Sequence, residues 1–231
     1  MYKIKIQFIL LVLIMSLPIA VQAQDWPNLQ KFQEANAEVL KTKNLESRVV
    51  FMGNSITEGW SSANPEFFTD NPYINRGISG QTTPQMLLRF QQDVIDLHPK
   101  AVVILAGTND IAGNTGPMTL EQIRDNILSM VQLAKANGIH SIVCSVLPAY
   151  DYPWRPGLQP NIKIPKLNQL LKEMVTEQNV TYLDYFSTMA DERNGLPKAY
   201  TTDEVHVTKE GYAVMEKLVN KAITQVIQNE N

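Results

Sequence analysis

Five short segments rich in aliphatic, β-branched and aromatic residues are spaced along the chain, at residues 49–52, 73–78, 101–106, 140–147 and 180–185. Two of them, 49–52 and 101–106, are apolar throughout. Runs without a polar alternation are typical of strands buried on both faces of a parallel sheet. The pattern therefore predicts five strands, of which these two lie near the centre of the sheet.

Between the predicted strands, apolar residues recur every three or four positions, which is the spacing of one helix face. The predicted helices cover 28–41, 83–97, 119–137, a segment around 164–174, and 209–227. Thr119, with Gln122 three residues later, has the pattern of an N-terminal capping box. In the first helix the expected inward face consists of Leu29, Phe32, Ala35, Val39 and Leu40.

Strand and helix alternate along the chain, which favours a parallel sheet with right-handed crossovers and helices on both faces. We therefore expect an α/β fold, a three-layer α/β/α sandwich around a five-stranded parallel sheet. At 231 residues, 44% of them hydrophobic, the chain is long enough for one sizeable core and does not require two.

The first 23 residues carry Lys3 and Lys5, then an apolar run, then small residues up to Ala23. This order is that of a secretory signal peptide cleaved after Ala23, which leaves one domain at 24–231 in a periplasmic or secreted protein. An uncleaved anchor is the alternative, but the apolar run is short for a membrane span. No cysteine near the cleavage site offers a lipid attachment point, because Cys144 is the only cysteine and lies in a predicted strand.

The net charge of the chain serves only to exclude some classes of binding partner. Loss of Lys3 and Lys5 takes the formal net charge from −3 to −5, because no acidic residue precedes residue 24. A mildly acidic chain without a basic run is a poor candidate for binding nucleic acid or an anionic membrane surface. We expect no nucleic-acid partner and no stable membrane anchor after cleavage, and the sequence leaves the oligomeric state open.

Ser55 stands just past the first predicted strand, in the stretch RVVFMGNSITEGW at 48–60. In open α/β sheets, ligands bind outside the carboxyl ends of the strands, so this serine is placed for chemistry. Taken alone, it is more simply interpreted as the N-cap of the following helix. The stretch lacks the Lys-Ser/Thr pair of a phosphate-binding loop and the second glycine of a nucleophile elbow.

Three later segments accompany this serine in a fixed order: INRGISGQTT at 74–83, LAGTND at 105–110 and DEVH at 203–206. With GNSIT, they resemble the four signature blocks of the SGNH/GDSL hydrolase superfamily. The variant is most similar to bacterial lysophospholipase-like and platelet-activating-factor-acetylhydrolase-like esterases, which also carry ITEGW or ITDGW. Many members have aspartate where this chain has Asn54, a difference that concerns the geometry of the loop rather than the nucleophile.

The resemblance implies a flavodoxin-like sandwich and a serine esterase mechanism that needs no cofactor. It implies that Ser55 is the nucleophile, His206 the base and Asp203 the acid that orients it. The implied oxyanion hole consists of the Ser55 and Gly80 backbone N–H groups and the Asn109 side chain. These residue types suit the task, because glycine allows close approach of bare backbone and an asparagine amide donates at any pH.

Other titratable residues fit these roles less well. His98 and His140 stand at predicted helix and strand ends and are interpreted as structural. Glu204 is the rival of Asp203 for orienting the imidazole, although its spacing matches the motif less well. One histidine and one aspartate, without further clustered histidine or cysteine, do not predict a metal site.

The segment 148–161, PAYDYPWRPGLQPN, follows the fourth predicted strand and should overhang the same edge of the sheet. Long loops of this kind are often functional, and aromatic rings can stack on a sugar or simply anchor the loop. The expected substrate rim comprises Trp60, Tyr150, Tyr152, Trp154 and Arg155.

The preferred function is that of an exported esterase that removes short acyl groups, above all acetyl, from carbohydrate. Two alternatives stay open. One is a lysophospholipase or thioesterase acting on lipid acyl chains, and the other is a carbohydrate-binding protein that has the same scaffold without activity. The sequence identifies neither the natural ester nor the length of its acyl chain.

Overall fold

The computed structural model describes residues 24–42 and 47–228. The signal peptide expected at 1–23 lies outside the described residues. Among the described helices, none has both the length and the hydropathy needed to cross a bilayer.

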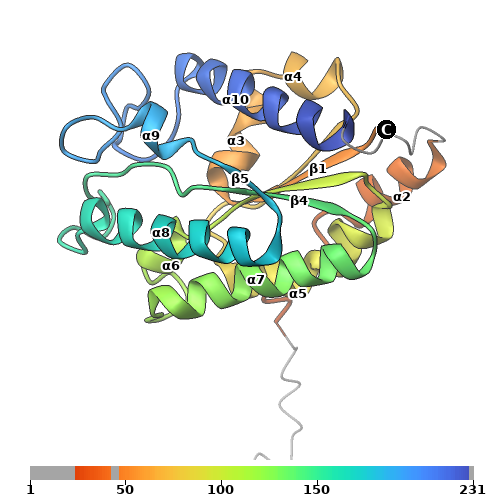
Figure 1. Cartoon of the computed structure of the whole chain (residues 1–231), viewed down its shortest axis with the longest axis horizontal. Coiled ribbons are helices and arrows are strands. Elements are labelled where there is room, and N and C mark those ends of the chain that lie inside the picture. The colour runs from red at the N-terminus through yellow and green to blue at the C-terminus, as the bar shows by residue number, and fades with distance from the viewer. Residues whose placement is uncertain (1–23, 43–46, 229–231) are drawn as a thin grey trace, which may run out of the picture.

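The central sheet has five parallel strands in the order β2-β1-β3-β4-β5 (Figure 1). The strands are β1 (Val49–Gly53), β2 (Tyr73–Gly77), β3 (Ala101–Leu105), β4 (His140–Cys144) and β5 (Thr181–Leu183). β1 and β3 are buried at every position, as their uninterrupted apolar runs predict. The expected α/β sandwich with a five-stranded parallel sheet is confirmed.

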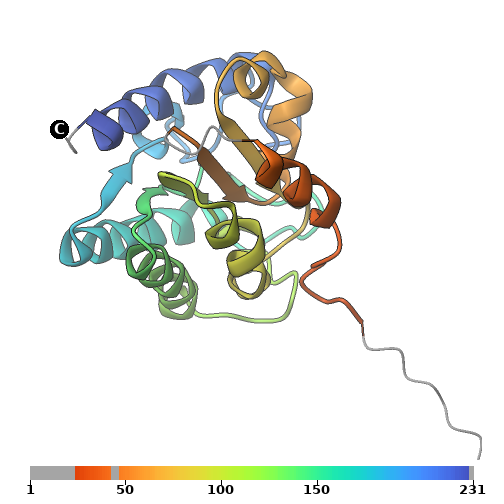
Figure 2. The ribbon, with the colours of Figure 1, turned by 90° about the vertical axis from the view of Figure 1, so that its right-hand side faces the viewer.

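Helices cover both faces of the sheet (Figure 1, Figure 2). One face is covered by α5 (Thr83–Asp93), α7 (Leu120–Ala136) and α8 (Pro160–Gln178), and the other by α3 (Ser55–Ala63) and α10 (Lys209–Gln228). The strand residues divide between two cores. Val50 and Met52 of β1 belong to the first core and Val49 and Phe51 to the second, because successive side chains of a strand point to opposite faces.

Shorter elements connect these layers. They are α2 (Gln33–Lys41), α4 (Glu66–Thr69), the 3₁₀ helix η1 (Ile95–Leu97), α6 (Thr108–Ile111) and α9 (Phe186–Met189). The capping box predicted at the start of α7 is present, since the Gln122 N–H donates to Thr119 Oγ1 and the Thr119 N–H to Gln122 Oε1.

The predicted inward face of the first helix is right only in part, because Val39 packs against the core and Leu29 and Phe32 are half-buried. Ala35 and Leu40 are exposed, and the buried residue of this helix is Asn36. Asn36 is buried because its side chain binds two buried charged groups, donating to Asp93 Oδ1 at 2.8 Å and accepting from Arg76 Nε at 2.8 Å. A polar contact across 40 residues or more cannot be read from local hydrophobic periodicity.

Candidate active site

Ser55 is the first residue of α3 and lies at the carboxyl end of β1. Asn54 is the N-cap of this helix, and its Oδ1 accepts the Ile56 N–H at 3.0 Å. Asparagine and aspartate both cap helices well, so this cap suits either residue. Gly53 cannot carry a side chain here, because a Cβ would lie 2.0 Å from Thr57 Oγ1.

Asp203, His206 and Ser55 form one chain of hydrogen bonds. His206 Nε2 lies 3.1 Å from Ser55 Oγ, and His206 Nδ1 lies 2.5 Å from Asp203 Oδ2. Asp203 Oδ1 also accepts the backbone N–H groups of Val205 and His206, at 3.0 and 2.7 Å. Partial burial raises the pKa of Asp203, but the hydrogen bonds from His206 and these two N–H groups outweigh it and hold the pKa below its usual value.

Glu204, the rival orienter, points elsewhere. Its Oε2 lies 3.6 Å from Arg193 Nη2, and its backbone has φ of 73°, in the left-handed region that non-glycine residues rarely adopt. The turn at Glu204 thus allows Asp203, and not its neighbour, to contact the imidazole.

The loop that contains Gly80 is tied to its surroundings at three consecutive residues. The Ser79 N–H donates to Glu58 Oε2 at 2.8 Å, the Gly80 carbonyl accepts from Asn114 Nδ2 at 3.1 Å, and the Gln81 carbonyl accepts from Asn109 Nδ2 at 2.9 Å. Gly80 has φ of +76°, which glycine adopts without strain. Asn109 is buried on α6, and its contact with Gln81 engages one of the two N–H groups of its amide.

Two aromatic residues of the expected rim are exposed. Trp154 is 44% exposed, its ring stacks on Tyr152 with centroids 5.1 Å apart, and it lies 6.4 Å from the His206 ring. Tyr150 is also exposed, but Arg193 covers its ring at 4.7 Å. Trp154 is therefore the rim aromatic that stands beside the candidate base.

Two of the other rim residues are buried, contrary to the expectation, and the third, Arg155, is exposed but binds backbone carbonyls. Trp60 is buried in the core, where its ring stacks on Phe67 and Tyr212 and its Nε1 donates to Glu216. Tyr152 is fully buried, with its hydroxyl 2.9 Å from Thr108 Oγ1. Arg155 donates to the carbonyls of Ala112 and Gly113, at 2.6 and 2.7 Å, so its guanidinium fastens the loop.

Aromatic residues serve both surfaces and cores, which is why composition alone misplaced Trp60 and Tyr152 on the rim.

A cavity of about 390 Å³ lies beside α6, and Asp110, Arg155 and Lys163 contribute charged groups to its lining. Thr83 donates to Asp110 Oδ1 through both its N–H and its hydroxyl, at 2.8 and 2.6 Å. Burial raises the pKa of Asp110 to about 6, against the lowering effect of these two bonds.

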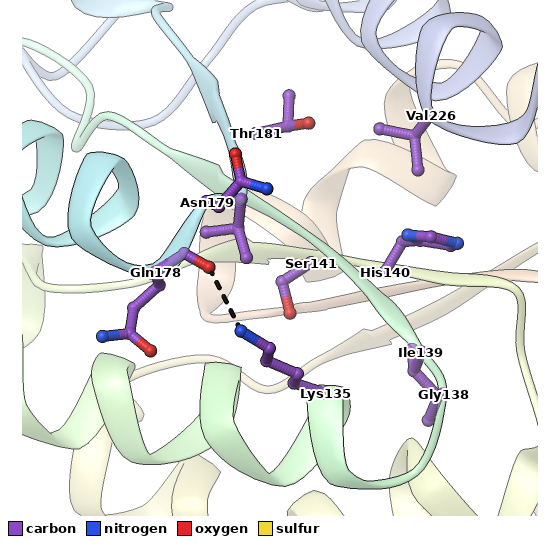
Figure 3. Close-up of a pocket in the computed structure, with 10 residues that line it drawn as sticks. Lys135, Gly138, Ile139, His140, Ser141, Gln178, Asn179, Thr181 and Val226 are labelled. Atoms are coloured by element: carbon purple, nitrogen blue, oxygen red, sulfur yellow. Dashed lines mark hydrogen bonds between the residues drawn. The ribbon is translucent and has the colours of Figure 1, made fainter. Parts of the chain in front are cut away.

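A second cavity, of about 400 Å³, lies at the opposite edge of the sheet (Figure 3). It is lined by residues at the amino ends of β4 and β5 and the carboxyl ends of α7 and α8, among them His140 and Thr181. Lys135 Nζ contacts the Gln178 carbonyl there at 3.5 Å. Because Ser55 lies at the carboxyl edge, this cavity is separate from the candidate active site.

The remaining candidate groups lie outside the site. His98 follows η1 and His140 begins β4, both at the edge of the sheet away from Ser55. Cys144 is buried, and burial raises the pKa of its thiol. In the described parts of the chain, 24–42 and 47–228, no three His, Cys, Asp or Glu side chains gather as metal ligands.

Sequence reasoning missed the side chains that hold these loops. Glu58 and Gln81 stand inside the recognised motifs but received no role. Arg89 and Asp93 were overlooked, although a charged pair four residues apart on the apolar face of a helix is an available signal. Both side chains are fully buried.

The chain matches one protein family and is similar to several solved structures. Residues 51–214 match the GDSL-like Lipase/Acylhydrolase family. A crystal structure of a Bacteroides fragilis protein assigned as an acylhydrolase is 48% identical, with a TM-score of 0.86, covering 89% of this chain and 100% of that one. A GDSL-like lipase from Bacteroides thetaiotaomicron is 46% identical, with a TM-score of 0.83, covering 86% of this chain and 98% of that one.

Two further similarities cover less of the chain or have a lower sequence identity. The uncharacterized lipoprotein YqeF of Bacillus subtilis is 37% identical over 81 residues, which span 34% of this chain and only 33% of that protein. An acetyl xylan esterase is 17% identical, with a TM-score of 0.63 over 76% of this chain and 98% of that one, and shares the fold.

The family match spans most of the chain and includes the four motifs on which the resemblance rests. The chain therefore belongs to the GDSL-like lipase/acylhydrolase family of carboxylic ester hydrolases, within the SGNH superfamily that its motifs resemble.

Proposed function

We propose that this protein is an exported serine esterase that removes short acyl groups, above all acetyl, from carbohydrate through an acyl-enzyme. The observation that carries the proposal is the chain of hydrogen bonds from Ser55 through His206 to Asp203. A serine hydroxyl is a weak nucleophile, and a base within hydrogen-bond reach that is itself oriented by a carboxylate is the arrangement that activates it.

The reaction proceeds in two acyl transfers. His206 Nε2 takes the proton of Ser55 Oγ as that oxygen attacks the ester carbonyl, and Asp203 stabilises the imidazolium that forms. The tetrahedral intermediate collapses, the bond to the alcohol breaks, and His206 gives its proton to the leaving oxygen. Water then attacks the acyl-enzyme with His206 again as base, and the acid leaves as Ser55 regains its proton.

The developing oxyanion needs donors that are already in place. In this proposal they are the backbone N–H groups of Ser55 and Gly80 and the second N–H of the Asn109 amide. The bond from Asn109 to the Gln81 carbonyl supports this role, because it fixes the amide beside the Gly80 loop.

The surroundings of His206 support a carbohydrate alcohol. His206 protonates the leaving alcohol, so the group beside His206 contacts that part of the substrate, and this group is the exposed ring of Trp154. A flat aromatic face can pack against a sugar ring. The acetyl xylan esterase of the same fold acts on such a substrate.

Export rests on the signal-peptide pattern at 1–23, and a relative that is a lipoprotein supports it. Amino-terminal sequencing of the protein recovered from the periplasm or the medium tests this part of the proposal. The expected first residue is Gln24.

The principal experiment measures hydrolysis of p-nitrophenyl esters from acetate to long acyl chains, and then release of acetate from acetylated xylo-oligosaccharides, by residues 24–231 and by Ser55→Ala. We expect acetate to be cleaved best and Ser55→Ala to be inactive on every ester. A preference for long chains would replace the carbohydrate substrate by a lipid one. Activity that survives in Ser55→Ala would remove the nucleophile assignment, and a wild-type protein inactive on all esters would favour a binding role.

A further inference from the structure

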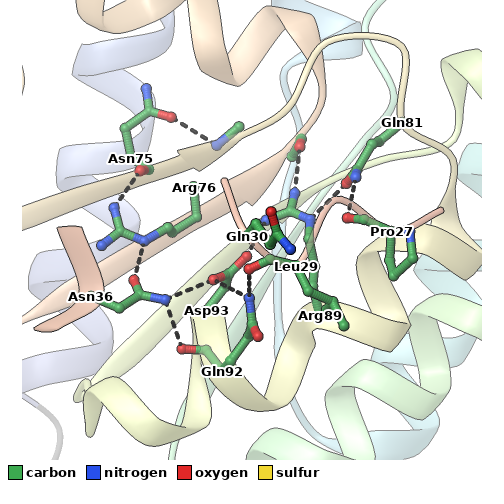
Figure 4. Close-up of polar contacts among 12 residues, drawn as sticks. Pro27, Leu29, Gln30, Asn36, Asn75, Arg76, Gln81, Arg89, Gln92 and Asp93 are labelled. Carbon is green, nitrogen blue, oxygen red and sulfur yellow. Dashed lines mark hydrogen bonds and ion pairs between the residues drawn. The ribbon is translucent and has the colours of Figure 1, made fainter. Parts of the chain in front are cut away.

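A group of buried and half-buried polar side chains connects α2, β2 and α5 with Gln81, the residue after Gly80 (Figure 4). Its members are Asn36, Arg76, Gln81, Arg89, Gln92 and Asp93. Arg89 and Asp93 form an ion pair of 3.0 Å, and both side chains are fully buried. A buried ion pair stabilises a fold weakly or not at all, because the loss of hydration offsets the attraction. Stability alone therefore does not account for this pair.

The rigid guanidinium of Arg89 contacts two segments of the site, the carboxyl end of β1 and the Gly80 loop. Its Nε donates to Gln81 Oε1 at 2.6 Å and its Nη2 to the Gly53 carbonyl at 3.1 Å, while Nη1 binds Asp93. Gly53 stands two residues before Ser55, and Gln81 directly follows Gly80. Because the guanidinium is planar, it sets the spacing between these two acceptors.

Both acceptors also connect to the proposed oxyanion donors. The Gln81 carbonyl receives the Asn109 amide at 2.9 Å, and the Gly53 carbonyl receives the Ile78 N–H at 3.1 Å, at the start of the Gly80 loop. From the other side, Gln81 Nε2 donates to the Pro27 carbonyl at 2.8 Å. Arg89 thus joins the carboxyl end of β1, two residues before Ser55, to the Gly80 loop, which Asn109 also contacts.

We propose that Arg89 is a positioning residue of the esterase, one that holds the Gly80 N–H and the Asn109 amide in register with Ser55 through its bonds to Gln81 and Gly53. Asp93 fixes the guanidinium from the side away from the loops. Arg89 is fully buried, so it acts through these loops and does not touch the substrate. This inference rests on the proposed function, because it assumes that Gly80 and Asn109 stabilise an oxyanion.

Arg76 provides a matched control within the same group. It is also buried, at 5% exposure, and its Nε and Nη1 donate to Asn36 Oδ1 and to the Asn75 carbonyl. These bonds lead toward α2 and along β2 rather than to Gly53 or Gln81. Removing either guanidinium breaks hydrogen bonds within the same buried group. Only the loss of Arg89 also removes the contacts with Gln81 and Gly53.

The test compares Arg89→Met, Arg89→Lys and Arg76→Met, with kcat and KM for p-nitrophenyl acetate and the affinity for a boronic acid that forms a tetrahedral adduct with serine. The midpoint of thermal unfolding is measured for each variant, and assays are run well below it. We expect Arg89→Met to lower kcat about 100-fold, the size of effect that a displacement near 1 Å produces. KM should change less than about threefold, and boronate affinity should fall in step with kcat, because the lost interaction exists only with the tetrahedral species.

Arg76→Met should lose stability while its kcat stays within about threefold of the wild type, since only indirect effects reach the site. The kcat of Arg89→Lys should lie between those of Arg89→Met and the wild type, because the lysine side chain is shorter and its ammonium can bind fewer of the three acceptors. If Arg89→Met does not fold, Gln81→Leu removes the same link from the loop side and should show the same loss of kcat and of boronate affinity.

Equal losses of kcat in Arg89→Met and Arg76→Met would overturn the inference, as would a loss confined to KM. Either result, obtained with an active wild type and an inactive Ser55→Ala, would leave the proposed function standing. Failure of the proposed function gives a different pattern, in which the wild type is inactive or Ser55→Ala retains activity, and the inference then falls with it.

Discussion

Asp203 and Glu204 are adjacent in the chain, yet only the first contacts the imidazole. The positive φ of Glu204 turns its side chain toward Arg193, while Asp203 receives two backbone N–H groups and His206 Nδ1. Replacing each carboxylate by its isosteric amide should therefore affect kcat strongly at Asp203 and little at Glu204.

Asp203→Asn should lower kcat by about 10³- to 10⁴-fold, because the amide cannot hold the imidazole in the required tautomer or stabilise its protonated form. Glu204→Gln is the matched control and should change kcat less than about threefold, since it removes only a surface ion pair. Steady-state hydrolysis of p-nitrophenyl acetate by the two variants checks this. A larger loss of kcat in Glu204→Gln than in Asp203→Asn would contradict this assignment and give the orienting role to Glu204.

Trp154 is the residue that should separate carbohydrate esters from simple ones. Trp154→Ala should raise KM for an acetylated xylo-oligosaccharide about 3- to 10-fold, the value of one aromatic packing contact, and should leave p-nitrophenyl acetate nearly unaffected. Trp26→Ala is the control, because Trp26 is similarly exposed, at 41%, and belongs to the amino-terminal segment. Equal effects of Trp154→Ala on both substrates would argue against a sugar-packing role.

At the scale of elements, the helices are held by polar contacts as well as by their apolar faces. α2 shows this best, because its buried position is Asn36 and not one of the leucine or alanine positions. α10 shows it too, since the Tyr212 hydroxyl donates to the Ile56 carbonyl at 2.7 Å and joins this helix to the one that begins at Ser55. Both contacts join segments far apart in the chain.

Asn36→Leu would improve the apolar stripe that periodicity suggests for α2, yet it should destabilise the protein. It leaves the buried Arg76 Nε without its acceptor and Asp93 Oδ1 with only the bond from Gln92 Nε2 at 3.3 Å, at a cost of about 2 kcal/mol in the free energy of unfolding. Ala35→Leu, at an exposed position of the same helix, should stay within about 0.5 kcal/mol of the wild type. Urea unfolding measures both, and an Asn36→Leu variant as stable as Ala35→Leu would contradict the account.

At the scale of the whole molecule, one buried carboxyl links the stability of the fold to pH. The pKa of Asp110 is raised to about 6 by burial, so the native state keeps a proton that the unfolded chain releases at lower pH. The stability conferred by this proton is fully present below the unfolded pKa and is lost as the pH rises through the folded one.

The wild type should therefore lose up to about 3 kcal/mol of unfolding free energy, relative to Asp110→Asn, between about pH 4 and pH 7. The amide keeps an oxygen to accept from Thr83 but does not titrate, so its own curve supplies the reference. Unfolding in urea at several pH values gives the difference directly. Two curves that run parallel across this window would show that the carboxyl titrates normally.

Periodicity and motif order were sufficient for much of this protein. The five strands, the long helices after them and the capping box at Thr119 depend on residues close in sequence, and they appear where the pattern predicts them. The spacing of Asp203 and His206 likewise allows their contact, because three residues form one turn. The resemblance of the motifs indicated the family, which the match over 51–214 confirms.

Only the tertiary structure decided the order of the strands, the burial of Trp60 and Tyr152, and the choice of Asn36 as the inward residue of α2. It also decided that one guanidinium, Arg89, bridges the loops before Ser55 and after Gly80. The physical reason is the same in each case. A chain specifies its local conformation through neighbours in sequence, whereas the partner that buries an aromatic ring or neutralises a charge is reached across dozens of residues and exists only after the layers have packed.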